Sequence, residues 1–248
     1  MRYSGNKPVI ARFAGEKPIL RRYAGSKLVW EATPSDPSLL LHLKFDGNVS
    51  DSSQYKNEVT LVRPENTSYV TGVEGQAVKL FNGQAGNVNK SYLTFPNEGA
   101  LAEIDTAFTV AFYLKAPAGS GLNPYILMNT SDTTSGFRIY PGSSDGKLQV
   151  WLFKENGTSE ILRTGANARF NSSEFNHFAI TYDGEALTWY YNFEPDTTAD
   201  VELVDITGTA DWRINSAATF VASQDITLDD FRIYNRALAA EEIERLAH

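Results

Sequence analysis

Residues 228–243 read LDDFRIYNRALAAEEI, and this stretch joins a strand pattern directly to a helix pattern. The first seven residues of the stretch are predicted to form a strand. Residues 239–246 are rich in Ala, Glu and Leu, which favours a helix with Leu238, Ile243 and Leu246 near one side. The chain is therefore expected to end in a strand followed by a short helix.

The same strand pattern recurs upstream, with Gly, Asn and Asp between the segments. The predicted strands are residues 39–45, 77–81, 92–95, 108–115, 137–140, 147–153, 175–182, 187–192 and 219–221. Many short strands separated by turn residues are typical of a sandwich. The sequence therefore predicts an all-β fold of two antiparallel sheets.

Four further motifs precede 228–243 in a fixed order. They are LHLKFDGN at 41–48 followed by DSS at 51–53, GQAVKLFNG at 75–83, FTVAFYLK at 108–115 and FNHFAITYDG at 175–184. Together the five motifs resemble the laminin G-like branch of the concanavalin A-like jelly rolls. The resemblance runs from about residue 39 to the C-terminus. It implies two curved sheets, a concave face that meets carbohydrate in many relatives, and often a calcium ion.

Two positions depart from the pattern of that family. Phe175 stands where the family usually has a tryptophan, and residues 190–194 read YYNFE where it usually has a strand ending in YVNG. The usual glycine turn is thus altered, and the loop after Asn192 cannot be predicted. The predicted core is unaffected.

Catalytic residues are not expected. Glucanases on this fold use the pattern Glu-x-Asp-x-Glu, because hydrolysis needs two carboxylates that flank the bond. The nearest match is Glu103-Ile-Asp105-Thr-Ala107, which lacks the third carboxylate, and the chain has only three histidines. Since the family contains far more recognition modules than enzymes, we expect a non-enzymatic protein. The alternative is a carbohydrate-active enzyme on the same fold, either a glycoside hydrolase or a polysaccharide lyase.

Calcium is the one metal that the sequence could support, since oxygen ligands are plentiful. The resemblance implies that the first and last strands lie close together, which would bring Asp46 and Asn48 towards Asp229. These residues are the candidate ligands of a structural ion. The alternative is that they cap their own turns.

Carbohydrate would bind where aromatic rings and amides share one face of a strand. The candidate ligand-binding residues are Trp189, Tyr191, Trp151, Gln149 and Asn192. The two-residue period of a strand puts Trp189 and Tyr191 on one face and Tyr190 on the other, while Trp151 shares a face with Gln149. The alternative for each aromatic residue is a place in the core.

The N-terminus repeats one decapeptide three times, as RYSGNKPVIA at 2–11, RFAGEKPILR at 12–21 and RYAGSKLVWE at 22–31. Each unit is predicted to be a short strand and a turn, because glycine tolerates a turn and proline disfavours a helix. So few residues rarely bury enough surface to fold alone. We therefore expect residues 1–31 to anchor or oligomerise the chain, residues 32–38 to be a linker, and residues 39–248 to be the jelly roll.

Charge divides the chain in the same place. Residues 1–31 hold seven Lys and Arg against two Glu, and subtracting these from 22 and 30 leaves 15 against 28, a net of −13, on residues 32–248. The repeats resemble those of virion proteins of tailed bacteriophages. This implies a fibre or decoration component that docks other virion proteins through residues 1–31, as a homo-oligomer and most commonly a trimer. The alternative is an appendage that folds back on its own domain.

The composition limits the location and the partners that are expected for the protein. No apolar run approaches membrane-spanning length, and no secretory signal is recognised, so membrane insertion is not expected. Dispersed basic residues make nucleic acid an unlikely partner. The expected function is therefore that of a virion component, made in the host cytoplasm, that displays a jelly roll for binding a cell-surface or environmental glycan.

Overall fold

The computed structural model divides the chain into two units, Met1–Asp36 and Pro37–His248. It describes residues 13–14, 17–18, 21–24, 27–31, 36–81, 90–117, 126–130, 135–141, 146–154, 158–165, 167–201, 204–216 and 225–247. Within this part of the chain, no helix has the length and apolar character needed to cross a bilayer.

The first unit forms hairpins. Strand β1 (Phe13–Ala14) pairs antiparallel with β2 (Lys17–Pro18), and β3 (Arg21–Ala24) pairs with β4 (Lys27–Glu31). The prediction of one strand per repeat is therefore wrong for the second and third repeats, each of which supplies two paired strands. Two residues separate the paired ends of each hairpin, which is the commonest hairpin connection. The first repeat lies outside the described residues.

Eight described strands of the second unit form one antiparallel sheet, in the order β17-β16-β15-β10-β19-β8-β7, with β5 also paired to β19. Their bounds are β5 (Leu39–Leu43), β7 (Thr67–Thr71), β8 (Gln76–Leu80), β10 (Phe108–Lys115), β15 (Asn176–Tyr182), β16 (Ala186–Tyr191), β17 (Glu194–Asp200) and β19 (Ile226–Tyr234). The C-terminal strand β19 thus lies in the middle of the sheet, next to the first strand of the domain.

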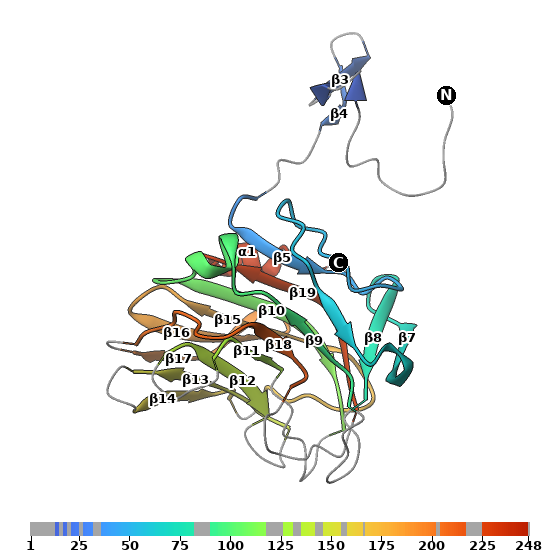
Figure 1. Cartoon of the computed structure of the whole chain (residues 1–248). Helices are drawn as coiled ribbons and strands as arrows, with labels where there is room; N and C mark the ends of the chain where they lie inside the picture. The colour runs from blue at the N-terminus through green and yellow to red at the C-terminus, as the bar shows by residue number, and fades with distance from the viewer. Residues whose placement is uncertain are drawn as a thin grey trace. The chain divides into compact units, whose positions relative to one another are not determined.

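Seven described strands form the second sheet, in the order β14-β13-β12-β11-β18-β9-β6. Their bounds are β6 (Thr60–Val62), β9 (Tyr92–Phe95), β11 (Leu127–Met128), β12 (Phe137–Pro141), β13 (Leu148–Phe153), β14 (Ser159–Arg163) and β18 (Trp212–Ile214). The two sheets are stacked as layers (Figure 1). The predicted fold class is confirmed: the domain is an all-β sandwich of two antiparallel sheets.

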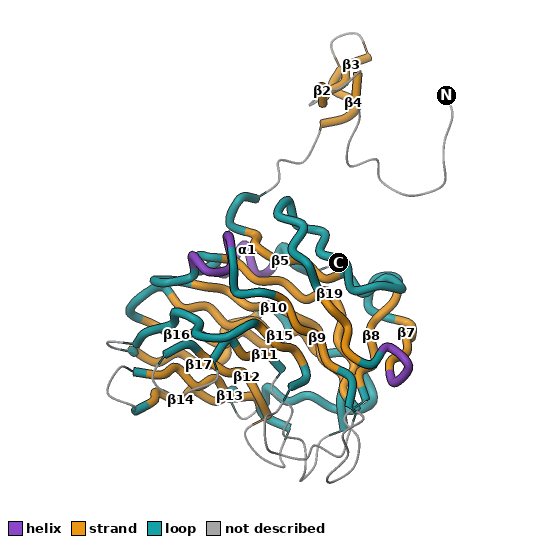
Figure 2. The backbone as a smooth tube through the Cα atoms, viewed as in Figure 1, coloured by secondary structure: helices purple, strands orange, loops and turns teal. Residues whose placement is uncertain are grey.

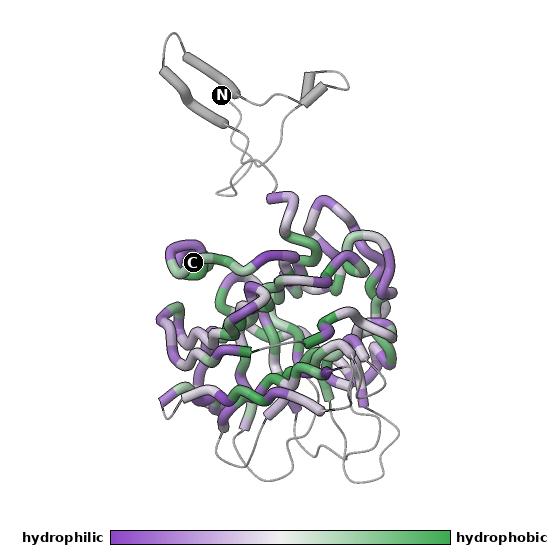
Figure 3. The backbone as a smooth tube through the Cα atoms, turned by 90° about the vertical axis from the view of Figure 1, so that its left-hand side faces the viewer, coloured by the Kyte–Doolittle hydropathy of each residue, from purple (hydrophilic) through white to green (hydrophobic). Residues whose placement is uncertain are grey.

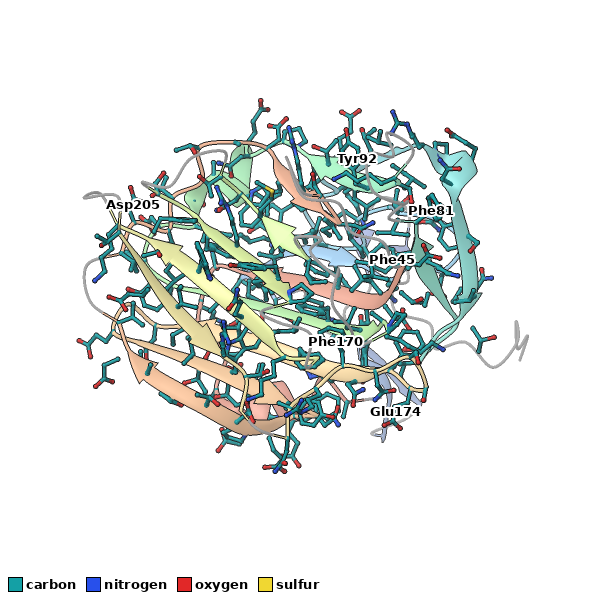
Figure 4. The ribbon with its side chains drawn as sticks, turned by 90° about the horizontal axis from the view of Figure 1, so that it is seen from below. Phe45, Phe81, Tyr92, Phe170, Glu174 and Asp205 are labelled. Carbon is teal, nitrogen blue, oxygen red and sulfur yellow. The ribbon has the colours of Figure 1, made fainter. Side chains whose placement is uncertain are left out.

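The core lies between the sheets. Phe108 of β10 stacks on Phe137 of β12, with ring centroids 4.4 Å apart, so side chains of the two layers interdigitate. The apolar segments concentrate along the strands of both layers (Figure 3). Phe45 and Phe170 lie inside the domain, whereas Glu174 and Asp205 lie at its periphery (Figure 4). Each fully buried large apolar side chain contributes about 1.5–3 kcal/mol to stability.

The C-terminal segment covers part of the opposite face of the eight-stranded sheet. Helix α1 (Ala240–Glu244) is drawn in Figure 2 with the 3-10 helices η1 (Pro64–Asn66) and η2 (Gly99–Glu103). A second apolar cluster joins Ala111, Ala179, Tyr190 and Tyr234 of the sheet to Leu238 and Ile243, with Leu246 packed against it. The three C-terminal residues predicted to share one side therefore do so, although α1 is shorter than the predicted 239–246. Of the described helices, α1 packs against β17 and η2 against β5, which are both strands of the eight-stranded sheet.

Candidate functional site

The outer face of the seven-stranded sheet is set by the alternation of side chains along β13. Leu148, Val150 and Leu152 belong to the core cluster. Because successive side chains point to opposite faces of a strand, Gln149, Trp151 and Phe153 point outward. The same alternation in β12 buries Phe137 and Ile139 and puts Arg138 and Tyr140 on the outer face.

Strand pairing aligns outward residues in one row across the sheet. Trp151 pairs with Ile161 on one side and with Arg138 on the other. Met128 pairs with both Arg138 and Arg213, and Arg213 pairs with Thr94. The row therefore runs through six strands, and its members come from sequence positions up to more than a hundred residues apart.

Three aromatic rings lie together beside this row. Trp151 meets Tyr140 edge to face at 5.5 Å between centroids and Phe153 at 6.3 Å. The guanidinium carbon of Arg138 lies 4.8 Å from the centre of the Phe153 ring, and Phe153 is only 1% exposed. Trp151 and Tyr140 are half-buried, so they are the rings of this group that a ligand can reach.

The Nε1 edge of Trp151 is covered and has no hydrogen-bond acceptor in the described part of the chain. A buried donor without an acceptor is unfavourable by about 1–3 kcal/mol. Few buried side-chain donors in native proteins lack an acceptor, so the environment of the Trp151 indole N–H is unusual.

Gln149 is a buried residue of this face that holds an arginine by a hydrogen bond. Its side chain is 4% exposed, and its Oε1 accepts a hydrogen bond from Nε of Arg163 at 3.0 Å. Arg163 and Ile161 of β14 are exposed. The amide predicted to contact a ligand therefore holds an arginine at the surface instead.

The other predicted ligand-binding residues lie on the eight-stranded sheet, where they are structural. The periodicity prediction was right: Trp189 and Tyr191 pack on the main core and Tyr190 on the second cluster. Trp189, however, is fully buried, and its Nε1 donates to the carbonyl of Leu162 at 3.1 Å. Its ring cannot stack on a sugar, because the other sheet covers it.

Tyr191 and Asn192 are engaged at the end of the same strand. The Tyr191 hydroxyl donates to Oδ1 of Asn176 at 2.7 Å, and Oδ1 of Asn192 accepts from the His177 backbone N–H at 2.9 Å. Asn192 and Phe193 both have positive φ, at 46° and 75°. The altered turn thus forces two non-glycine residues into a conformation that side chains rarely adopt.

The seam between β5 and β19 contains a cavity of about 80 Å³ lined by His42, Lys44, Asp46, Glu74, Asp229, Asp230 and Arg232. Asp46 and Asp229 are therefore brought to one place, as predicted from the order of the strands. Asn48 is not among the lining residues. It caps its own loop, because its Oδ1 accepts from the Ser50 N–H at 2.9 Å.

Both aspartates of the seam bind backbone of the same turn. Oδ1 of Asp46 accepts from the Gln76 N–H at 2.9 Å, and Oδ2 of Asp229 accepts from the Val73 N–H at 2.7 Å. Burial raises the pKa of Asp229 to about 6, against the lowering effect of the hydrogen bonds that its carboxylate accepts from the backbone of Val73, Glu74 and Asp230. The carboxylates thus cap a turn.

Basic side chains line the same cavity. Asp230 contacts Nε2 of His42 at 2.6 Å and a terminal nitrogen of Arg232 at 2.8 Å, and Lys44 also lines the space. Among the described residues, no group of three or more His, Cys, Asp or Glu side chains is arranged to hold a metal ion. The donor set of Asp46, Asn48 and Asp229 does not fit calcium in this conformation.

Sequence reasoning missed the arginines of the outer face, because a single arginine in a strand carries no signal of its own. Arg138 could have been found from the alternation in Phe137-Arg-Ile-Tyr140, which places it beside Tyr140. Arg213 could not, since its strand has three residues and its neighbour Met128 comes from a distant segment.

Comparison with known proteins agrees with this architecture. A family model described as the concanavalin A-like lectin/glucanases superfamily matches residues 85–244. The binding domain of Paraclostridial Mosquitocidal Protein 1 superposes with a TM-score of 0.72 at 20% identity, over 85% of this chain and 52% of that chain. No curated protein sequence matches the chain significantly.

Two botulinum neurotoxin structures are similar to the same extent. The binding domain of neurotoxin DC in complex with SialylT gives a TM-score of 0.68 at 19% identity, over 85% of this chain and 51% of that chain. A structure of neurotoxin type C, whose cell entry is described as dependent on interaction with two ganglioside molecules, gives 0.65 at 16% over the same shares. At these identities the likeness establishes the fold. The chain spans about half the length of each of these structures.

Proposed function

The chain belongs to the concanavalin A-like lectin/glucanases superfamily, and from this we propose that it is a non-catalytic module that binds carbohydrate on the outer face of its seven-stranded sheet. The observation that carries the proposal is Trp151. Its half-buried ring lies on that face at β13, the strand next to the edge strand β14, beside Tyr140 and Arg138. Pyranose rings stack on such aromatic faces, and arginine donates hydrogen bonds to their oxygens.

The structural neighbours support the class of ligand. The botulinum neurotoxin type C protein is described as interacting with gangliosides, which are glycolipids. The Mosquitocidal Protein 1 and neurotoxin DC structures are of binding domains, which favours recognition over hydrolysis for this chain as well. Glu103 and Asp105, the nearest approach to a glucanase motif, are exposed in and after η2, which packs against β5 of the eight-stranded sheet.

A shallow face with two reachable rings gives weak binding. Little area is available to offset the loss of freedom on association, so dissociation constants on the order of micromolar to millimolar are expected. Several copies on one particle would raise the apparent affinity, because each further contact forms at high effective concentration.

We propose that residues 1–31 supply this multivalency by attaching the chain to a larger assembly, the virion of a tailed bacteriophage. The strands β3 and β4 form a hairpin of four and five residues, which is too small to be stable alone. A homo-oligomer, with a trimer favoured, or a docked virion protein would cover such hairpins.

The test is Trp151→Ala in the full chain, measured on a glycan array and then by calorimetry with the best saccharide. Loss of binding at an unchanged melting temperature supports the proposal. Tyr55→Ala is the matched control, because Tyr55 is a 40% exposed aromatic residue in the segment before β6, and β6 is at the opposite edge of the sheet from β13 and β14. Retained binding in Trp151→Ala, or release of reducing or unsaturated ends from any bound saccharide, contradicts it.

A further inference from the structure

The outer face of the seven-stranded sheet has a charge opposite to that of its domain. Three arginines point outward from its described strands, namely Arg138, Arg163 and Arg213. The one acidic residue of these strands, Glu160, pairs with the core residue Leu152 and therefore points to the other face, where Lys154 binds it at 2.5 Å. Residues 32–248 carry a net charge of −13, so three outward arginines, with no outward acidic residue among the described strands of this sheet, depart from the charge balance of the domain.

The arginines surround the aromatic rings. Arg138 and Arg213 both pair with Met128, on its two sides, so their Cα atoms lie about two strand spacings apart, ~9.5 Å. Arg163 pairs with Gln149, whose other neighbour across the sheet is Tyr140. Across the strands, the Trp151 ring therefore lies between Arg163 of β14 on one side and Arg138 of β12 and Arg213 of β18 on the other.

Two of these guanidinium groups are held in place by contacts within the face. Nε of Arg163 donates to the buried Gln149, and the guanidinium of Arg138 lies over the Phe153 ring. A fourth cation adjoins Arg213: burial lowers the pKa of Lys90, and the positive charge of Arg213 lowers it further.

We propose that the carbohydrate bound on this face is acidic, an oligosaccharide whose carboxylates are held by Arg138 and Arg213 while a pyranose ring stacks on Trp151. This inference rests on the proposed function and names its ligand class. A guanidinium fork matches a carboxylate in two parallel hydrogen bonds, and such charge-assisted bonds are about twice as strong as neutral ones. Carboxylates also need no metal ion here, since arginine supplies the charge.

The experiment compares acidic saccharides with neutral counterparts. The full chain is titrated with oligogalacturonate and with its fully methyl-esterified form, and with sialyllactose and lactose. At least tenfold tighter binding of one acidic member over its neutral partner is expected, weakening as salt rises. Dextran sulfate against dextran distinguishes a sulfate from a carboxylate ligand.

The variants Arg138→Gln and Arg213→Gln should each remove at least a factor of ten from binding of the acidic member and little from the neutral one. Arg245→Gln is the matched control, because Arg245 is exposed at the end of α1, on the other sheet. The melting temperature of each variant shows that the fold is intact.

Each other outcome is decisive. Equal binding of acidic and neutral members overturns the inference and leaves the proposed function standing. Absence of all saccharide binding overturns both. A tighter, Arg138-dependent interaction with a single-stranded DNA oligonucleotide than with any acidic saccharide overturns the inference in favour of a nucleic-acid ligand, and preference for dextran sulfate alone overturns the carboxylate assignment.

Discussion

The indole Nε1 of Trp189, on the eight-stranded sheet, donates to the carbonyl oxygen of Leu162, on the seven-stranded sheet, at 3.1 Å. This bond ties β16 to β14, which are both near the same edge of the sandwich. The same side chain fills the core there, with no exposed surface.

Trp189→Ala is therefore expected to lower the free energy of unfolding by about 3–5 kcal/mol, because a large cavity replaces the ring and the Leu162 carbonyl loses its donor. Trp151→Ala removes a half-buried ring at the outer face and should lower the free energy of unfolding by much less. Urea titrations of the two variants make the comparison. Similar losses in both would show that Trp151 is a core residue and would weaken its assignment as a ligand platform.

Asp229 should make the domain less stable as pH rises from about 4 to 6. Burial raises its pKa to about 6 in the folded state, whereas the unfolded chain releases this proton near 3.8. The folded state thus binds more protons in this window, and its advantage is lost as pH rises through 6. The loss is limited to about 3 kcal/mol at 1.36 kcal/mol per unit of pKa.

Asp229→Asn should remove that decline, as measured by urea unfolding at pH 4 and pH 6.5. Asp183→Asn is the control, because backbone hydrogen bonds from Ala186 and Glu185 lower the pKa of Asp183, so its effect has the opposite sign. An unchanged decline in Asp229→Asn would assign the pH dependence to another group.

Chelation tests calcium at Asp46 and Asp229. Because both carboxylates already accept backbone hydrogen bonds and two cations line the same cavity, EDTA should leave the melting temperature unchanged. A fall in EDTA that disappears in Asp229→Ala would establish that an ion binds there after all. An ion at a hundredfold excess over its dissociation constant adds about 2.7 kcal/mol.

Removing residues 1–31 should leave a folded monomer. The jelly roll has its own core, whereas hairpins of this size need a partner. Light scattering of the intact and shortened chains measures the change. An intact chain that is monomeric, with an N-terminus resistant to protease, would contradict the anchoring role.

The strands that sequence reasoning missed are mostly edge strands. The sequence did not predict β6, β7, β14 and β17, and each of these is the last strand at one edge of its sheet. An edge strand has one unpaired side and few buried residues, so it lacks the apolar pattern by which central strands are recognised. β17, for example, reads EPDTTAD. The predicted strand 219–221 lies outside the described residues.

The sequence by itself determined the fold class and the two faces of each central strand, because alternation is a local property with a period of two residues. It placed Trp189 with Tyr191, and Trp151 with Gln149. Only the tertiary structure decided which of these faces is covered. Trp189 meets the opposite sheet through Leu162, whereas Trp151 faces away from it, and that difference depends on the stacking of strands that are distant in the sequence. The row of outward residues across six strands, which brings Arg138 and Arg213 to one face, has the same origin, since register between distant segments leaves no mark on any one of them.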